Sequence, residues 1–133
     1  MKLSSIMVPL FSSLGIMGTQ AGSPQISPPP KIVPHDVSEK GYLPLFAGPP
    51  ETVAMRSGGV ILHPAKSIGK HSTGENEEIL VILEGRGEML ITEGKTLQLS
   101  KSVVAYCPPH TEHDVVNNGS DILRYVYVVA KSR

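Results

Sequence analysis

Short runs rich in Val, Ile and Leu recur along the chain from residue 51 onward, and turn-forming residues separate them. Runs of this length and composition are typical of β-strands. Outside the first 21 residues, apolar positions do not recur with the spacing of a helix face. The pattern predicts strands at residues 52–56, 59–63, 67–73, 77–83, 88–92, 96–99, 103–107, 113–117 and 122–129.

The breaks between these runs have the chemistry of tight turns and bulges. Glu93-Gly94 separates two apolar runs and predicts a hairpin, while Ser57-Gly58-Gly59 and Asn117-Asn118-Gly119 allow positive φ. Residues 43–46 are expected to lie against the domain as an edge or lid. Many short strands at this spacing predict an all-β fold, an antiparallel sandwich or barrel.

The chain divides into three segments. Residues 1–21 are interpreted as a signal peptide, because Lys2 precedes an apolar stretch at 6–17 and the small residue Ala21 offers a cleavage site. Residues 22–35 form a Pro-rich tether, and residues 36–133 form the domain. This organisation predicts a secreted or periplasmic protein with no membrane association after the signal is removed.

Charge and cysteine content narrow the class of protein. Lys plus Arg number 12 and Asp plus Glu number 12, so no broad basic surface recommends a nucleic-acid partner. Cys107 is the only cysteine, which excludes an intrachain disulfide. Because it falls within an apolar run, we expect it to be a small interior residue rather than a nucleophile.

Imidazoles and carboxylates cluster in two stretches, residues 69–85 and 108–117, between apolar runs. Ionisable groups are costly to bury unless they are paired or bind a metal. A metal pocket inside a β-barrel is therefore the hypothesis to test. Either Glu77 or Glu78 can supply the carboxylate, since alternate positions along 77–83 are equally apolar on both faces.

These stretches resemble the two motifs of the cupin superfamily, in particular its small single-domain, type-2-like members. The residues that carry the resemblance are His71, Thr73, Glu78 and Gly85 in the first motif, and Pro108, His110, His113 and Asn117 in the second. The chain departs from the pattern at Thr73, where a second histidine is usual. It departs again at His110, where Gly or Asn usually makes the turn, and at Ser102, which replaces a Gly. The resemblance implies a single cupin-type antiparallel barrel, also called a double-stranded β-helix or jelly roll.

The resemblance also implies a metal site formed by His71, Glu78 and His113, with the spacing to Gly85 favouring Glu78 over Glu77. Two imidazoles and one carboxylate suit Fe or Mn, while Zn or Ni could also occupy such a set. Thr73, two residues from His71, is expected to face the same side, either as a supporting hydroxyl or as a weak extra contact to the metal. His110 either replaces the missing imidazole or is a turn residue with unusual backbone geometry.

Other polar residues of the predicted strands could line the same pocket. Arg56 and Tyr106 are the foremost candidates, with Tyr125 and Tyr127 beside them. Arg56 could pair with a carboxylate of the substrate.

Three functions remain open from the sequence. The first is a metal-dependent oxygenase-like oxidoreductase, or an isomerase, that acts on a small molecule. The second is a non-catalytic cupin that has lost its metal and binds a sugar or an organic acid. The third is a structural homodimer, in which pairing would cover the long apolar last strand, residues 125–129.

Overall fold

The computed structural model describes residues 27–36 and 41–132. The predicted signal peptide, residues 1–21, lies outside this part of the chain. Residues 27–35, the described part of the predicted tether, form no strand or helix. The described residues contain no helix long and apolar enough to cross a membrane.

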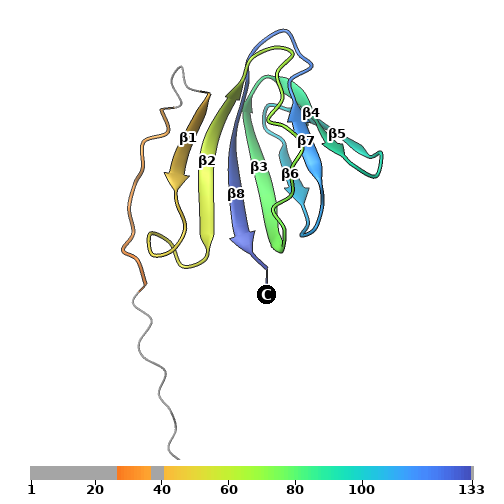
Figure 1. Ribbon diagram of the computed structural model, residues 1–133. Helices are drawn as coiled ribbons and strands as arrows, with labels where there is room; N and C mark the ends of the chain where they lie inside the picture. The colour runs from red at the N-terminus through yellow and green to blue at the C-terminus, as the bar shows by residue number, and fades with distance from the viewer. Residues whose placement is uncertain (1–26, 37–40, 133) are drawn as a thin grey trace, which may run out of the picture.

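All regular structure in the described chain is β-strand, which confirms the predicted all-β class. Two antiparallel sheets face one another (Figure 1), one with strand order β1-β2-β8-β3-β6 and the other with order β5-β4-β7. The strands are β1 (Tyr42–Phe46), β2 (Met55–Leu62), β3 (Asn76–Glu84), β4 (Arg86–Ile91), β5 (Thr96–Ser100), β6 (Val104–Cys107), β7 (His113–Val116) and β8 (Leu123–Lys131).

The last strand, β8, lies in the middle of the larger sheet. It pairs with β2 on one side and with β3 on the other. Its backbone groups are therefore satisfied within the chain, and it is not the exposed edge that its apolar sequence could have made it.

One edge of the larger sheet is β1, which pairs with β2 alone, and the other edge is β6. This confirms the expectation that residues 43–46 lie against the domain as an edge. Pro44 is tolerated there because an edge strand does not need every backbone donor.

Three of the predicted strands differ from the structure. Residues 52–56 and 59–63 were expected to be separate strands, but β2 runs through Ser57-Gly58-Gly59 without a break. Gly58 is required for packing: a Cβ at this position would lie 2.7 Å from the Tyr127 ring. Residues 67–73 form only two isolated bridges, because glycines with positive φ at both ends of the His71 segment, Gly69 (93°) and Gly74 (63°), prevent a regular strand.

The two sheets enclose one apolar core. Its buried members include Val60, Leu62, Leu80, Ile82, Met89, Leu99, Val115 and Leu123. Along β3, Glu78 lies on the inward face with Leu80 and Ile82, whereas Ile79 is 36% exposed and Leu83 is 38% exposed. The structure thus settles which of two equally apolar faces of this strand is buried.

Candidate metal centre

His71 and His113 are brought together by their backbones. The amide of His71 donates to the carbonyl of His113 at 2.9 Å, and the amide of His113 donates to the carbonyl of His71 at 2.8 Å. This is the hydrogen-bonded pair of an antiparallel ladder, whose two side chains project from the same face. The imidazole centroids consequently lie 4.4 Å apart, with the ring planes tilted by 56°.

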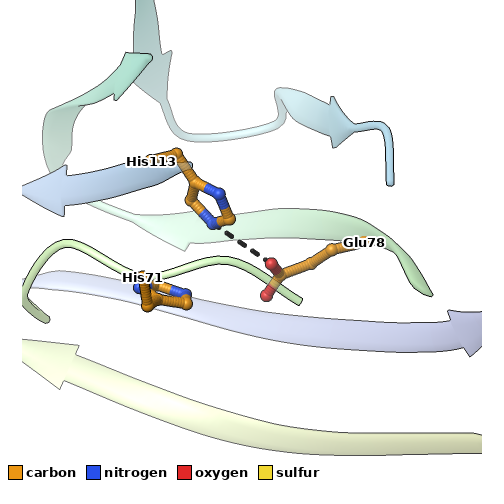
Figure 2. Close-up of side chains that lie close together, drawn as sticks. All are labelled: His71, Glu78 and His113. Carbon is orange, nitrogen blue, oxygen red and sulfur yellow. Dashed lines mark ion pairs between the residues drawn. The ribbon is translucent and has the colours of Figure 1, made fainter. Parts of the chain in front are cut away.

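Glu78 reaches the same point from the opposite sheet. It is paired with Cys107 of β6 and with Val129 of β8 on the inward face of β3. One ligand atom from each of His71, Glu78 and His113 lies within 4.8 Å of the others. Figure 2 shows the Glu78 carboxylate and the two imidazoles meeting between the sheets.

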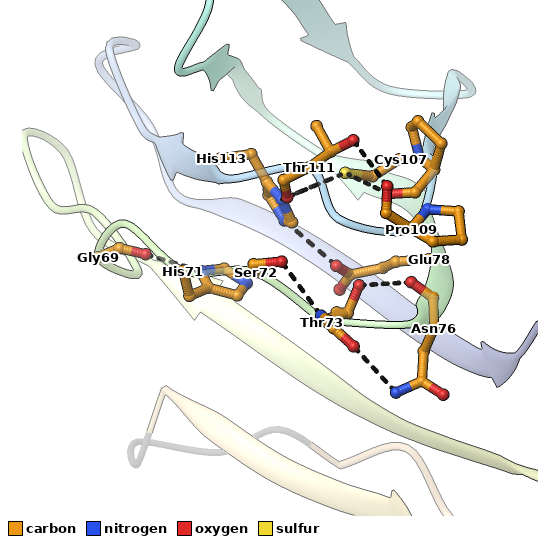
Figure 3. Close-up of polar contacts among 12 residues, drawn as sticks. Gly69, His71, Ser72, Thr73, Asn76, Glu78, Cys107, Pro109, Thr111 and His113 are labelled. Carbon is orange, nitrogen blue, oxygen red and sulfur yellow. Dashed lines mark hydrogen bonds and ion pairs between the residues drawn. The ribbon is translucent and has the colours of Figure 1, made fainter.

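Backbone carbonyls orient both imidazoles. Nδ1 of His71 lies 2.7 Å from the carbonyl oxygen of Gly69, and Nδ1 of His113 lies 3.1 Å from that of Thr111 (Figure 3). Because a carbonyl can only accept, each Nδ1 carries the proton in the neutral ring. Each Nε2 is then left with its lone pair free, as in histidines that bind metals through Nε2.

One buried atom of the Glu78 carboxylate and one of the His113 imidazole have no hydrogen-bond partner. Nε2 of His113 and Oε2 of Glu78 are 3.2 Å apart, close enough for an ion pair when His113 is protonated. Their alignment does not meet hydrogen-bond geometry, so neither buried atom has a hydrogen-bond partner. A cation placed between them would satisfy both atoms, and the donor set of two nitrogens and one carboxylate suits a divalent metal.

The surroundings of His113 raise its pKa. Burial by itself lowers the pKa of His113, but contact with the Glu78 carboxylate and with the Thr111 carbonyl raises it by more, so the net pKa is raised. A metal bound at Nε2 would have to displace the proton that this arrangement favours.

Thr73 lies in the same pocket as His71, as strand parity predicted. Its hydroxyl donates to the carbonyl oxygen of Asn76 at 2.8 Å, at the first residue of β3. The hydroxyl therefore fastens the loop that carries His71 to the strand that carries Glu78.

His110 does not replace the missing imidazole. It is exposed, its φ is 58°, and its amide donates to the carbonyl oxygen of Gly74 at 2.6 Å. Of the two roles considered for His110, the structure supports that of a turn residue. His110 does not line the pocket that holds the His–Glu–His cluster.

The expectation that Tyr106 lines the pocket is also wrong. Tyr106 is 52% exposed, and its hydroxyl donates to Glu77 at 3.1 Å. Its register partner on β3 is Ile79, which lies on the outward face. Tyr106 and Glu77 belong to that outer face, which also excludes Glu77 from the carboxylate role.

Arg56 does line the pocket, together with Tyr125 and Tyr127. The pocket has a volume of about 250 Å³ and includes all three members of the His–Glu–His cluster. A larger polar hollow of about 920 Å³ lies between the turns at Gly85 and Asn118, but it contains no histidine.

Tyr42 and Cys107 also contribute to this region, although neither was predicted from the sequence as a neighbour of the site. Tyr42 lies on the edge strand and lines the pocket, and its hydroxyl is 2.6 Å from that of Tyr127. Sγ of Cys107 is 3.2 Å from Nδ1 of His113. Tyr42 is far from Tyr127 in sequence, and Cys107 lies on a different strand from His113, six positions before it. These contacts therefore follow from the arrangement of the strands and could not be identified from the sequence.

Residues 59–129 match the protein family described as "Cupin domain". No curated protein matches the sequence.

Several solved structures share this fold. The cupin 2 conserved barrel domain protein from Salinispora arenicola is 22% identical, with a TM-score of 0.65, and the match covers 78% of this chain and 91% of that one. The RmlC-like cupin with a double-stranded β-helix fold from Methanocaldococcus jannaschii is 17% identical, with a TM-score of 0.64 and coverage of 77% and 91%. For the cupin domain of Schizosaccharomyces pombe Cnp3 the values are 21% identity, a TM-score of 0.62, and coverage of 68% of this chain but only 64% of that one.

The structural likenesses support the predicted double-stranded β-helix, and the family match extends over both motif segments. Together they show that this chain belongs to the cupin family.

Proposed function

We propose that this protein is a metal-dependent cupin in which His71, Glu78 and His113 hold one divalent ion, Fe or Mn. The observation that carries the proposal is the facing pair of buried atoms, Nε2 of His113 and Oε2 of Glu78, which lack hydrogen-bond partners. Nε2 of His71 completes a set of three protein ligands, which leaves coordination positions open.

The proposed activity is oxygenase-like and acts on a small molecule. A metal held by two imidazoles and one carboxylate supplies a centre at which substrate and oxygen can meet. The protein's part is to fix the ligands: the carbonyls of Gly69 and Thr111 hold the Nδ1 protons of the two imidazoles. The apolar wall that includes Leu80 and Val115 limits the access of water.

Metal analysis of the purified full-length protein tests the proposal. We expect close to one Fe or Mn per chain, and His71→Ala or His113→Ala should weaken binding of added Mn(II) by at least about 100-fold. His63→Ala is the matched control, because His63 is exposed and lies outside the cluster. Equal metal content in all three variants would remove the site.

A metal-free ligand-binding cupin is the second candidate. The 3.2 Å pair between His113 and Glu78 favours it, because protonation of His113 compensates the buried carboxylate without a metal. Absence of metal in the purified protein, together with no uptake of added Fe(II) or Mn(II), would support this alternative.

Export remains part of the proposal, supported by the sequence of residues 1–21 alone. N-terminal sequencing of the mature protein tests it, with Gly22 as the expected first residue. A mature chain that still begins at Met1 would contradict export through a cleaved signal.

A further inference from the structure

Arg56 lies in one row with the carboxylate of the cluster. It pairs with Val129 of β8, and Val129 pairs with Glu78 of β3. Residues opposite one another in a sheet share a face, so all three face inward. Neighbouring strands lie about 4.8 Å apart, which places the backbones of Arg56 and Glu78 about 10 Å apart. One small molecule can span the space between these two side chains.

The Arg56 guanidinium has no carboxylate partner among residues 27–36 and 41–132. The carboxylates that form ion pairs there take other partners: Glu51 pairs with Lys31, Glu84 with Arg124, Glu112 with Lys70, and Glu78 with His113. An unpaired guanidinium lining a pocket favours an anionic ligand, and its planar fork matches a carboxylate.

Two tyrosine hydroxyls lie in the same pocket. Those of Tyr42 and Tyr127 are 2.6 Å apart, and their rings stack with centroids 6.2 Å apart. One hydroxyl donates to the other, so the accepting hydroxyl keeps its own hydrogen for a ligand. Burial raises the pKa of Tyr127, which therefore remains protonated at neutral pH. Gly58 leaves the space that the Tyr127 ring fills.

The remaining lining is apolar and the space is small. Val60, Leu80 and Val129 are the apolar lining residues named here, and Val129 lies between Arg56 and Glu78 in the strand register. A volume of about 250 Å³ lies below the usual range for drug-sized ligands. The pocket therefore suits a short apolar body with a polar group at each end.

We propose that the pocket binds a small organic carboxylate, with its carboxylate on Arg56 and the Tyr42–Tyr127 hydroxyl pair. Its short carbon body lies against Val60, Leu80 and Val129. The other end faces His71, Glu78 and His113, where an oxygen of the ligand would meet the metal; this last contact rests on the proposed function.

Titrating metal-stripped, full-length protein with monocarboxylates of graded length tests the anion site without relying on the metal. The probes are acetate, butyrate, hexanoate, lactate and 3-hydroxybutyrate, each with its methyl ester, followed by calorimetry and by NMR of the arginine side chains. We expect the acids to bind at least about tenfold more tightly than their esters. Arg56→Gln should lose this preference, and Arg56→Lys should retain part of it because charge remains but the fork does not.

Arg124→Gln is the matched control, since Arg124 pairs with Glu84 and does not line the pocket. Its acid binding should equal that of the wild type. Arg56 is exposed, and an unchanged melting temperature of Arg56→Gln would exclude misfolding. Equal binding of acids and esters, unaltered binding in Arg56→Gln, tighter binding of inorganic phosphate than of every acid, or no binding at all would each overturn the proposal.

The two proposals can fail separately. Arg56-dependent acid binding by a protein that takes up no Fe(II) or Mn(II) would overturn the metal centre and leave the anion site standing. Metal uptake that depends on His71 and His113, without any preference for acids over esters, would support the metal centre and overturn the anion site.

Discussion

His71 and His113 exchange both of their backbone hydrogen bonds, at 2.9 and 2.8 Å, so the backbone itself sets the two imidazoles side by side. The pairing is an isolated bridge on a loop rather than part of a long ladder. Neighbouring bonds, from Ile68 to Val115 and from His110 to Gly74, hold that loop on either side. The two imidazoles are thus prearranged before any ligand binds.

Ionisation of His113 should make the stability of the metal-free protein depend on pH. Its pKa is raised in the folded state, against the effect of burial, chiefly by Glu78 and the Thr111 carbonyl. The resulting stabilisation is fully present below the ordinary histidine pKa of about 6.5 and is lost as pH rises through the raised value. In Glu78→Gln, the contributions of the carboxylate are lost, so the pKa of His113 should fall and this stabilisation should shrink. Urea denaturation between pH 5 and 9 measures the difference, and parallel profiles for the two proteins would contradict it.

Metal affinity should rise over the same pH range. Protons compete with the metal for Nε2 of His113, and the raised pKa extends that competition to higher pH. Titration of metal-stripped protein with Mn(II) at pH 6 and pH 8 should show tighter binding at pH 8. Equal affinity at the two pH values would indicate that His113 is not a ligand.

Cys107 should be inert in the folded protein. Its side chain is 0% exposed, and burial, with a smaller contribution from the Glu78 carboxylate, raises its pKa to about 11. A disulfide reagent at pH 7.5 should therefore modify it only after addition of urea, because the thiolate is the reactive form. Rapid modification without denaturant would show that this side of the centre is open to solvent.

Gly85 should not tolerate a side chain. Its φ is +82°, and a Cβ would lie 2.0 Å from the carbonyl oxygen of Ile122. Gly85→Ala should lower the free energy of unfolding by about 3 kcal/mol or more, combining backbone strain with a clash against backbone. Gly94→Ala is the matched control, since Gly94 has φ +90° but open space around it. It should lose only about 1 kcal/mol in the same urea titration. Equal losses would show that the clash relaxes at no cost.

Asn117 should be a structural residue. Its amide nitrogen donates to the carbonyls of Leu62 and Asp121, both at 2.8 Å, and its amide oxygen accepts from Gly119 at 2.9 Å. The side chain is 0% exposed, so Asn117→Ala leaves buried groups unpaired and should cost about 3 kcal/mol. Asn118→Ala, at the exposed neighbouring position, should be close to neutral in the same denaturation assay. A neutral Asn117→Ala would contradict this role.

The sequence predicted most strands because apolar runs and turn residues are local signals. The sequence could not show which face of β3 is buried, because residues 80 and 82 are as apolar as residues 79, 81 and 83. The partner strands decide that question, through pairing with Cys107 and Val129. The same limit explains the misplacement of Tyr106, whose face follows from its pairing with Ile79.

The resemblance to the cupin motifs implied the cluster of His71, Glu78 and His113, and the structure brings these residues together. The role of Thr73 was only partly predictable. The alternation of side chains predicted that Thr73 faces the same side as His71. The hydrogen bond from its hydroxyl to the carbonyl of Asn76 depends on how the loop enters β3. Tyr42 carried no local signal, because its neighbour in the pocket, Tyr127, is distant in sequence.

Anomalous diffraction from crystals of the Mn(II)-loaded protein tests the metal centre most directly. The account predicts one strong manganese peak at about 2.0–2.3 Å from Nε2 of His71, Nε2 of His113 and a carboxylate oxygen of Glu78. A peak at another location, or a structure in which His113 keeps its contact with Glu78 and no manganese lies between them, would contradict it.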